Sequence, residues 1–348
     1  MGSFTEGSHG VRRCHSEVHE EKLGLSLYIK ALFLIFMTKV LASGLGGGLD
    51  VVNALLIYAA LENEGNEPVL GSIRPIVPEQ VFPRIQFSEN GCWVDRDSRI
   101  TGYNGRCVEP KIAAALGKDI LLFSRRKESE REVEGLAEAI ADMEHLFSDM
   151  FFVDGGGDSL ILKKEDAIAE SEYKDPFQGE DAVSLAALTQ FPNAYLAVIS
   201  VGLDISEEAF RRNVDLLSER GAYFGRVNLV SGEKEGRSLE GLERVIQFQS
   251  GFLDRYFTLA EKILVLKEED IADPSKTKSH TAVVAYHALK GNFGLQRTFV
   301  RWEPTVDGQK GVLVNPEHQW MYFFKASAVH PLKKELNPGH SYFSGEEQ

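Results

Sequence analysis

Three stretches of the chain place glycines and an aspartate directly after an apolar run, and this combination can bind a ligand. They are residues 43–50 (SGLGGGLD), 154–159 (DGGGDS) and, with a single glycine, 200–204 (SVGLD). Glycines let a ligand approach the backbone closely, and amides at a helix N-terminus attract anions. Because parallel strands end on one edge of a sheet, we expect the three stretches to converge on one crevice. The alternative is that each glycine only makes a tight turn.

Five aspartates at expected strand ends or helix starts form a second group of candidates. They are Asp50, Asp154, Asp158, Asp181 and Asp204. Grouped carboxylates can hold Mg²⁺ together with phosphate or water, hydrogen-bond the hydroxyls of a sugar, or supply a general base. The alternative for Asp50, Asp181 and Asp204 is the capping of a helix or turn. Asp158 follows three glycines and has no evident capping duty.

These two groups together predict a single ligand site centred on Asp158. Asp158 and Asp50 are the predicted catalytic residues and the candidate metal ligands, with Mg²⁺ as the ion that such ligands suit. The residues predicted to hold the substrate or its anionic group are Gly46, Gly47, Gly48, Gly155, Gly156, Gly157, Ser159, Asp181 and Asp204.

Several well-known cofactor and catalytic motifs are absent from the sequence. The dinucleotide fingerprint G-x-G-x-x-G fails, because Leu49 stands at its sixth position and Asp50 places negative charge where a pyrophosphate would dock. We therefore expect neither NAD nor FAD. The patterns GxxxxGK[ST], HExxH and GxSxG are also missing, which removes the signatures of P-loop NTPases, zincins and α/β-hydrolases.

Basic residues offer weaker candidates than the aspartates. His280 follows Lys276 and Lys278 in a hydroxyl-rich stretch that could meet an anionic substrate, although a solvated helix start is the favoured explanation. The pairs at 125–126 (Arg-Arg) and 333–334 (Lys-Lys) are expected to be solvated surface charges.

The elements that must position these residues alternate between strand and helix. Residues 39–73 are expected to form a βαβ unit, with a strand at 39–43, a helix from Asp50 to Glu64 and a strand at 67–73. Further strands are expected at 119–124, 150–154, 194–201 and 226–230, and further helices at 130–148, at 180–190 and after a cap at Ser206. This alternation predicts an α/β fold whose doubly wound, Rossmann-like, mostly parallel sheet carries helices on both faces.

Two parts of the chain depart from the alternation. Residues 77–106 contain Pro78, Pro83 and two Asn-Gly pairs, so we expect hairpins in a β-rich insertion beside the sheet. The C-terminal part is expected to be α+β, with helices at 239–253 and 279–289, a strand at 262–266 and two or three strand-like pieces within 298–324.

The predicted domain organisation is a single large α/β domain at 23–330 between two polar ends. Residues 1–22 are polar and aperiodic, which indicates a disordered leader, and residues 331–348 are expected to form a loose tail. The apolar run at 25–37 contains Lys30 and is shorter than the roughly 18 apolar residues that a membrane span requires. We therefore expect it to be a core element rather than a signal peptide or membrane anchor.

Composition and charge limit the class of protein. Of 348 residues, 43% are hydrophobic and 26% charged, which is typical of a globular chain. The net charge of -14 would repel a phosphate backbone, so a small molecule rather than nucleic acid is the expected partner. The three cysteines, Cys14, Cys92 and Cys107, form no CxxC pair, which favours a reducing, cytoplasmic location. Nothing in the composition predicts the oligomeric state.

The glycine and aspartate motifs, taken in order, resemble the uncharacterised family named domain of unknown function 1152, which is largely archaeal with scattered microbial eukaryote members. The resemblance runs from about Lys39 to about His330. It rests on GGGLDVV at 46–52, VEP at 108–110, DGGGDSL at 154–160, ED at 180–181 and SVGLD at 200–204. The chain departs from the family pattern in its polar leader and at Leu49, where a glycine is more usual. The resemblance implies the fold and the place of the site, and it implies no activity.

Two functions from different classes fit these residues. The first is an enzyme acting on a phosphorylated or hydroxyl-rich small metabolite, nucleotide-like or sugar-like. The second is a non-catalytic small-ligand binder or scaffold. An enzyme should gather at least two of Asp50, Asp158, Asp181 and Asp204 around one pocket, whereas a binder could satisfy each carboxylate separately with backbone amides.

Overall fold

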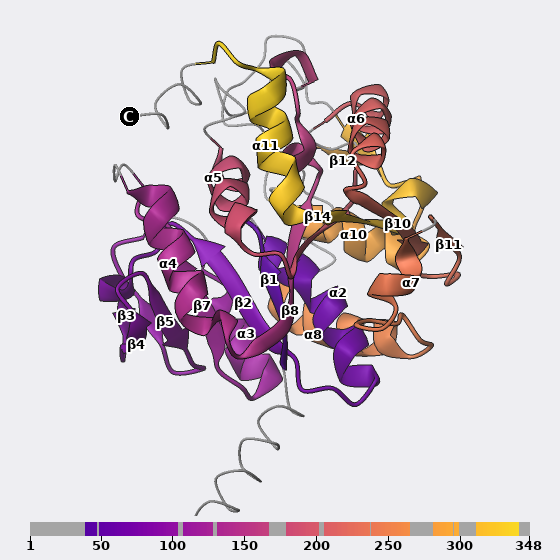
Figure 1. Cartoon of the computed structure of the whole chain (residues 1–348). Coiled ribbons are helices and arrows are strands. Elements are labelled where there is room, and N and C mark those ends of the chain that lie inside the picture. Colours follow the sequence, from indigo (N-terminus) through magenta and orange to yellow (C-terminus); the bar gives the residue numbers. More distant parts are fainter. Residues whose placement is uncertain are drawn as a thin grey trace, which may run out of the picture. The chain divides into compact units, whose positions relative to one another are not determined.

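The computed structural model describes residues 39–46, 49–103, 107–127, 131–166, 179–201, 205–236, 238–264, 281–294, 296–298 and 311–340 (Figure 1). The chain divides into two units, Met1–Thr38 and Lys39–Gln348, and every described residue belongs to the second unit. The predicted leader at 1–22 and the apolar run at 25–37 thus lie outside the described residues. The same holds for four residues considered as site candidates, Gly47, Gly48, Asp204 and His280.

The centre of the second unit is a ten-stranded sheet whose five middle strands are parallel. Their order is β9 (Ala194–Ile199), β8 (Phe147–Gly155), β1 (Lys39–Gly44), β2 (Val69–Arg74) and β7 (Ile120–Ser124). Continuous apolar runs suit these positions because both faces of each strand are covered, and every residue of β7 is buried. The expected α/β fold with a large, mostly parallel central sheet is confirmed.

The βαβ unit predicted at 39–73 is also confirmed. β1 and β2 pair in parallel from Leu41 opposite Val69 to Gly44 opposite Ser72. The connecting helix α2 (Asp50–Asn63) is buried from Asp50 through Leu61. Since β8 pairs in parallel with both β1 and β9, the strands that end near Ser43, Asp154 and Ser200 belong to one sheet and run in one direction, as predicted.

Antiparallel strands continue the sheet beyond β9. β14 (Trp320–Lys325) pairs with β9, β10 (Tyr223–Asn228) pairs with β14, and β11 (Lys234–Glu235) lies outermost. A strand from near the end of the chain therefore lies between two strands that precede it by about a hundred residues or more. A separate pair, β12 (Gln296–Thr298) and β13 (Gly311–Leu313), is also antiparallel.

Beyond β7, the sheet continues into the turn-rich segment at 77–106. β5 (Gly91–Val94) pairs antiparallel with β7, and β4 (Ile85–Ser88) forms a hairpin with β5. β3 (Val81–Phe82) and β6 (Arg99–Ile100) make a small pair of their own. Of the hairpins expected here, β4–β5 is present, and it forms part of the central sheet rather than lying beside it, whereas β3 and β6 are separated in the chain by that hairpin.

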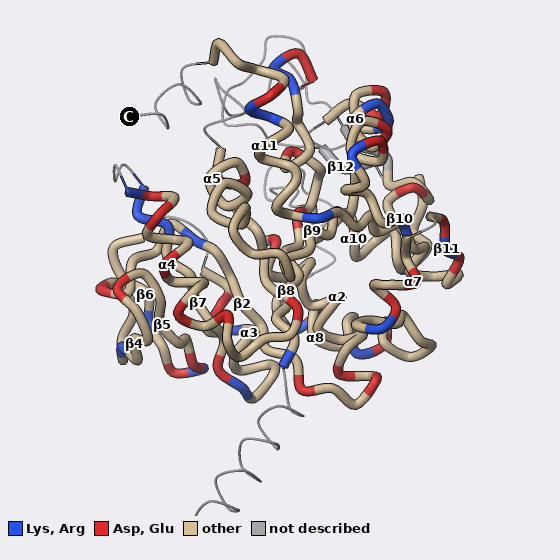
Figure 2. The backbone as a smooth tube through the Cα atoms, viewed as in Figure 1, with Lys and Arg blue, Asp and Glu red and all other residues tan. Residues whose placement is uncertain are grey.

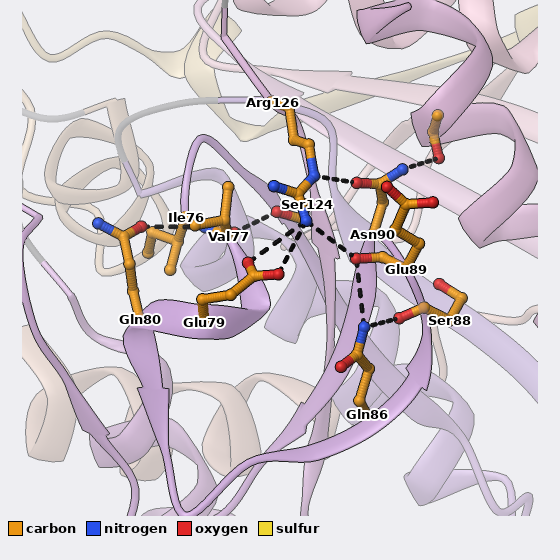
Figure 3. Close-up of polar contacts among 11 residues, drawn as sticks. Ile76, Val77, Glu79, Gln80, Gln86, Ser88, Glu89, Asn90, Ser124 and Arg126 are labelled. Atoms are coloured by element: carbon orange, nitrogen blue, oxygen red, sulfur yellow. Dashed lines mark hydrogen bonds and ion pairs between the residues drawn. The ribbon is translucent and has the colours of Figure 1, made fainter. Parts of the chain in front are cut away.

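Polar contacts of Arg126 hold this segment against the end of β7 (Figure 3). Its Nε donates to Oδ1 of Asn90 at 2.6 Å, and its Nη2 pairs with Glu79 at 3.1 Å. Beside it, the hydroxyl of Ser124 donates to the carbonyl of Ile76. Arg126, expected to be a solvated charge, is one-third exposed, and its guanidinium also bridges two parts of the segment.

Side chains of alternate strand residues enter two separate hydrophobic clusters, as the pleat of a strand requires. In β1, Val40 and Ala42 belong to one cluster and Leu41 to the other. The first cluster takes residues of α2, α3 (Glu109–Leu116), α7 (Leu239–Leu242), α8 (Phe252–Leu264) and α10 (Thr281–Leu289). The second takes residues of α4 (Glu132–Glu144), α5 (Glu180–Ala187), α6 (Glu207–Glu219) and α11 (Ala326–Leu336).

Helix α6 shows how the sequence determines where a helix starts and which of its faces is buried. Oγ of Ser206 accepts a hydrogen bond from the Ala209 amide at 3.2 Å, so the predicted cap is confirmed. Phe210 and Leu217 enter the second cluster, while acidic and basic residues are interspersed along the rest of the helix (Figure 2).

The C-terminal part differs from the sequence prediction in two places. The strand expected at 262–266 is wrong over its described residues, because Lys262 to Leu264 end helix α8. The helix expected at 239–253 is shorter than predicted, since α7 ends at Leu242 and α8 begins at Phe252.

The loose tail expected from residue 331 is also contradicted over its first residues. Helix α11 continues to Leu336, and Leu332 and Lys333 are buried. The packed part of the chain thus extends past the predicted boundary at 330. Across the described residues, no helix has the length and apolarity needed to cross a membrane.

Candidate functional site

Three buried aspartates meet at the carboxyl ends of the parallel strands. Asp154 lies near the end of β8, Asp50 is the first residue of α2, and Asp181 lies in the first turn of α5. One carboxylate oxygen from each lies within 4.8 Å of the others, a spacing that could hold a metal ion. We call these three residues the aspartate cluster.

Asp50 connects α2 to β8 instead of capping its own helix. The N-cap of α2 is Leu49, and no side chain caps that end. Oδ1 of Asp50 accepts a hydrogen bond from the Gly155 amide at 3.1 Å. The capping alternative considered for Asp50 is therefore wrong, and its carboxylate faces the glycine stretch of β8.

Asp154 is a member of the cluster that the prediction of site residues left out. It is fully buried, and its Oδ2 accepts hydrogen bonds from the backbone amide of Ser159, at 3.3 Å, and from the Ser159 hydroxyl. Ser159, predicted to bind the ligand, contacts Asp154. The signal that could have identified Asp154 is its place at the end of a buried strand, directly before three glycines.

Asp181 is the most perturbed carboxyl of the cluster. Burial raises its pKa well above the ordinary value. The charges of Asp158, Asp154 and Asp50 raise this pKa further, and so does a hydrogen bond to Asp158. Such surroundings favour the protonated acid, and a divalent cation would supply the positive charge that lets the carboxyl ionise.

Asp158, the predicted centre of the site, lies at the margin of the cluster. It is half-buried and begins a short 3₁₀ turn, Asp158–Leu160. The structure thus brings Asp50, Asp158 and Asp181 together around one point, with Asp154 as the additional member.

The glycines allow the close approach that this arrangement requires. A Cβ at Gly46 would overlap Oδ1 of Asp181, so only glycine fits beside the start of α5. Gly156 and Gly157 have φ angles of 116° and 100°, which favour glycine. A Cβ at Gly155 would overlap the side chains of Asn53 and Thr281.

The site also contains a buried lysine, Lys333, which the sequence analysis did not predict. Only 1% of it is exposed, and no described residue accepts a hydrogen bond from its Nζ. Burial lowers the pKa of the amine to about 8, while the charges of Asp158, Asp181 and Asp154 act in the opposite direction. The expectation of a solvated Lys-Lys pair is wrong for Lys333.

A helical pattern could have identified Lys333. Ala326, Val329 and His330 are buried, and Lys333 continues this spacing along the same face of α11. Helix α11 packs against α5, which carries Asp181, and against β9.

Ion pairs occupy the same sheet edge next to the cluster. Arg125, 4% exposed, follows β7 and pairs with Glu132 at 3.2 Å and with Glu180 at 2.9 Å, so the solvated state expected for it is also wrong. Glu180 precedes Asp181, which means that α5 presents one carboxylate to Arg125 and the next to the cluster. At the end of β2, Arg74 pairs with the buried Glu109 at 3.3 Å.

A serine in an uncommon backbone conformation directly follows β9. Ser200 has a φ of 58°, is fully buried, and its hydroxyl has no hydrogen-bond partner among the described residues. Backbone strain of this kind is concentrated at functional sites, although the hydroxyl lacks the flanking glycine of a nucleophile elbow.

A cavity of about 600 Å³ lies next to this strand end. Val201, His318 and Tyr322 are among its lining residues. A Cβ on Gly157 would lie 3.9 Å from Cγ1 of Val201, so the glycine stretch adjoins the cavity wall. The volume is within the range of small-molecule sites.

Comparison with known proteins gives one match. Residues 41–247 match the family described as Protein of unknown function (DUF1152). The chain belongs to this family. The match includes the whole aspartate cluster and ends before α11, and is shorter than the resemblance expected from the motifs. No curated protein and no solved structure matches the chain.

Proposed function

We propose that this member of the DUF1152 family is an enzyme that acts on a small phosphorylated or hydroxyl-rich metabolite, nucleotide-like or sugar-like, with the help of a divalent cation such as Mg²⁺. The observation that carries the proposal is the meeting of Asp50, Asp154 and Asp181 within 4.8 Å at the carboxyl ends of parallel strands. In open α/β sheets ligands bind at this edge. We also take the sheet as doubly wound and Rossmann-like, since helices of both hydrophobic clusters flank its parallel strands.

Each residue of the site has a distinct role in this proposal. The three clustered carboxylates are oxygen ligands of the kind Mg²⁺ takes, and Mg²⁺ usually binds to one or two carboxylates plus substrate phosphate and water. Asp158, half-buried beside them, is the proposed general base. The glycine stretch at 155–157 lets the substrate approach the backbone. The cavity beside Val201 adjoins this stretch at Gly157, and its lining residues include none of the clustered aspartates.

A non-catalytic ligand binder is the second candidate. It is favoured by the hydrogen bonds from the Gly155 amide to Asp50 and from the Ser159 amide to Asp154, because these give one oxygen of each carboxylate a backbone partner without a substrate. In a binder no group needs a shifted pKa, whereas Asp181 has one.

The remaining parts of the proposal concern partners and location. A small molecule is the proposed partner, and NAD, FAD, nucleic acid and membranes are not expected. A reducing, cytoplasmic location is supported by the three cysteines of the sequence, which form no CxxC pair.

The test is a titration of the full chain with MgCl₂ by isothermal calorimetry. Asp154→Asn keeps the volume of the side chain and removes its charge, so we expect Mg²⁺ binding at least tenfold weaker than in the wild type. Asp142→Asn, an exposed position on α4, is the matched control and should bind as the wild type does. Equal Mg²⁺ affinity in both variants would contradict the proposed cation site.

Turnover separates the enzyme from the binder. A thermal-shift screen of sugar phosphates and nucleotides identifies ligands, since a ligand at 100 times its dissociation constant stabilises a protein by about 2.7 kcal/mol. For any ligand that is consumed, Asp158→Asn should lower turnover by the roughly 10²- to 10⁴-fold typical of general base removal. Ligands that bind but are never converted would favour the binder.

A further inference from the structure

Lys333 carries a buried amine for which the described residues offer no hydrogen-bond partner. A lysine on a helix usually extends its stem so that the ammonium reaches water. Here only 1% of the residue is exposed, and none of the described residues accepts a hydrogen bond from Nζ. Burying an unsatisfied ammonium is unfavourable, so a fold that keeps one in place needs a compensating interaction.

The amine lies near the acidic site, on a helix that packs against α5, the helix of Asp181. The charges that act on Lys333 are those of Asp158, Asp181 and Asp154, which surround the point where the aspartate cluster meets. Nevertheless, Lys333 is not hydrogen-bonded to any of these carboxylates in the part of the chain that the structure describes. The carboxylates of the aspartate cluster and the separate ammonium of Lys333 therefore lie around the same point. The carboxylates are suited to bind a cation, and the ammonium is suited to bind an anion.

The chemistry of the amine limits what it can contact. An ammonium offers three donors and no acceptor, so it cannot ligate a cation. A sugar hydroxyl could accept one hydrogen bond from it but would leave the charge uncompensated. A phosphoryl group meets both requirements, because one of its oxygens can bind Mg²⁺ on the carboxylates while another accepts from the ammonium.

We propose that Lys333 binds the phosphoryl group of the substrate opposite the cation held by Asp50, Asp154 and Asp181. This inference rests on the proposed function and narrows its substrate class to phosphorylated metabolites. It also gives α11, which lies beyond the family match, a part in the site.

The test compares Lys333→Met with Lys334→Met in the full chain. Both changes remove one ammonium and keep an unbranched side chain, and Lys334 is the half-buried neighbour. The probes are MgCl₂ alone, and then inorganic phosphate, ribose 5-phosphate and ribose at saturating Mg²⁺, all measured by isothermal calorimetry. Melting temperatures establish that both variants fold, and we expect Lys333→Met to melt no lower than the wild type, because methionine is satisfied in an apolar site.

We expect Lys333→Met to bind Mg²⁺ as tightly as the wild type or more tightly, because a like charge is removed. Its affinity for inorganic phosphate or ribose 5-phosphate should fall at least tenfold, the loss of one charge-assisted hydrogen bond. Lys334→Met should stay within twofold of the wild type, and ribose should bind no better than either phosphate.

Three results would overturn the inference. Phosphate affinity that is equal in Lys333→Met and the wild type would show that the amine is only a counter-ion of the carboxylates. Tighter binding of ribose than of ribose 5-phosphate would reverse the substrate class. Wild-type protein that binds Mg²⁺ but neither inorganic phosphate nor ribose 5-phosphate would overturn the role of Lys333 and leave the proposed cation site intact. Wild-type protein that binds no Mg²⁺ would instead contradict the proposed function itself.

Discussion

His318 is a buried ionisable residue near the carboxyl ends of the parallel strands. Its pKa leads to a prediction that does not depend on any ligand. It is 2% exposed and lies in the short 3₁₀ turn Pro316–Gln319, directly before β14. Its Nδ1 accepts a hydrogen bond from the Asn315 amide at 3.3 Å, and the ring also hydrogen-bonds to the backbone of Val201. Burial lowers the pKa of His318 from 6.5 to about 4, so the folded protein holds this imidazole neutral.

Because His318 is held neutral in the folded protein, the free energy of unfolding should fall as the pH is lowered. The unfolded chain binds a proton near pH 6.5 and the folded chain only near pH 4, so the contribution of His318 is present above pH 6.5 and is lost as the pH falls toward 4. Between pH 7.5 and pH 5 the loss should be roughly 2 kcal/mol. Urea unfolding of wild type and His318→Gln at both pH values checks this, with the exposed His145→Gln as control. An unchanged pH dependence in His318→Gln would contradict the assignment.

At the scale of single residues, the sequence predicted which aspartates lie at the site better than it predicted what each of them contacts. Asp50, Asp158 and Asp181 were identified because carboxylates after buried strands gather on one edge. Asp154 was left out of the predicted site residues, since the sequence does not reveal which way the last residue of a strand points. Lys333 was missed because a Lys-Lys pair in a polar tail resembles a solvated surface, and only the packing of α11 against α5 buries it.

At the scale of elements, the closest approach in the site is between the loop after β1 and the first turn of α5. An alanine Cβ at Gly46 would overlap Oδ1 of Asp181, a buried carboxylate in the first turn of α5. We expect Gly46→Ala to reduce the free energy of unfolding by about 1–3 kcal/mol, as overpacking in a buried site does. Mg²⁺ affinity should fall as well, because the displaced carboxylate belongs to the aspartate cluster.

The matched control for this prediction is Gly241→Ala in α7. A Cβ at Gly241 meets nothing within 4 Å, and alanine is a better helix former than glycine. Gly241→Ala should therefore leave Mg²⁺ affinity unchanged and keep or raise stability in urea unfolding. If Gly46→Ala behaves as Gly241→Ala does, the proximity of Gly46 to Asp181 has no consequence for the site.

Elements with a clear local period were the ones that the sequence predicted. The βαβ unit follows from a short apolar run, a glycine loop and a mostly apolar helix, and each of these is readable within a few residues. The strand expected at 262–266 was wrong because two residues of that apolar run, Ile263 and Leu264, continue the buried stripe that starts at Phe252 and includes Tyr256. A five-residue window cannot distinguish the end of such a stripe from a strand.

At the scale of the whole molecule, the order of strands could not be derived from the sequence. β14 lies between β9 and β10, so the sheet is completed only when a late strand enters next to much earlier ones. Local patterns say that β14 is apolar, and its Met321, Phe323 and Phe324 are fully buried, but they do not say which strands it joins. Pairings of this kind depend on contacts between residues far apart in the sequence.

This topology predicts that the part of the chain matched by the family is not a folding unit by itself. A chain ending after residue 247 would lack β14, α8, α10 and α11, leaving β10 without the strand that joins it to β9. Both hydrophobic clusters would lose buried residues, among them Tyr256 from the first and Phe324 from the second. We expect this shortened protein to show no cooperative urea transition and no Mg²⁺ binding. The control is a chain ending after residue 340, which keeps all of these elements and should unfold as the full chain does. A cooperative transition in the chain ending at residue 247 would contradict the prediction, because it would mean that β9 and β10 keep their positions without β14.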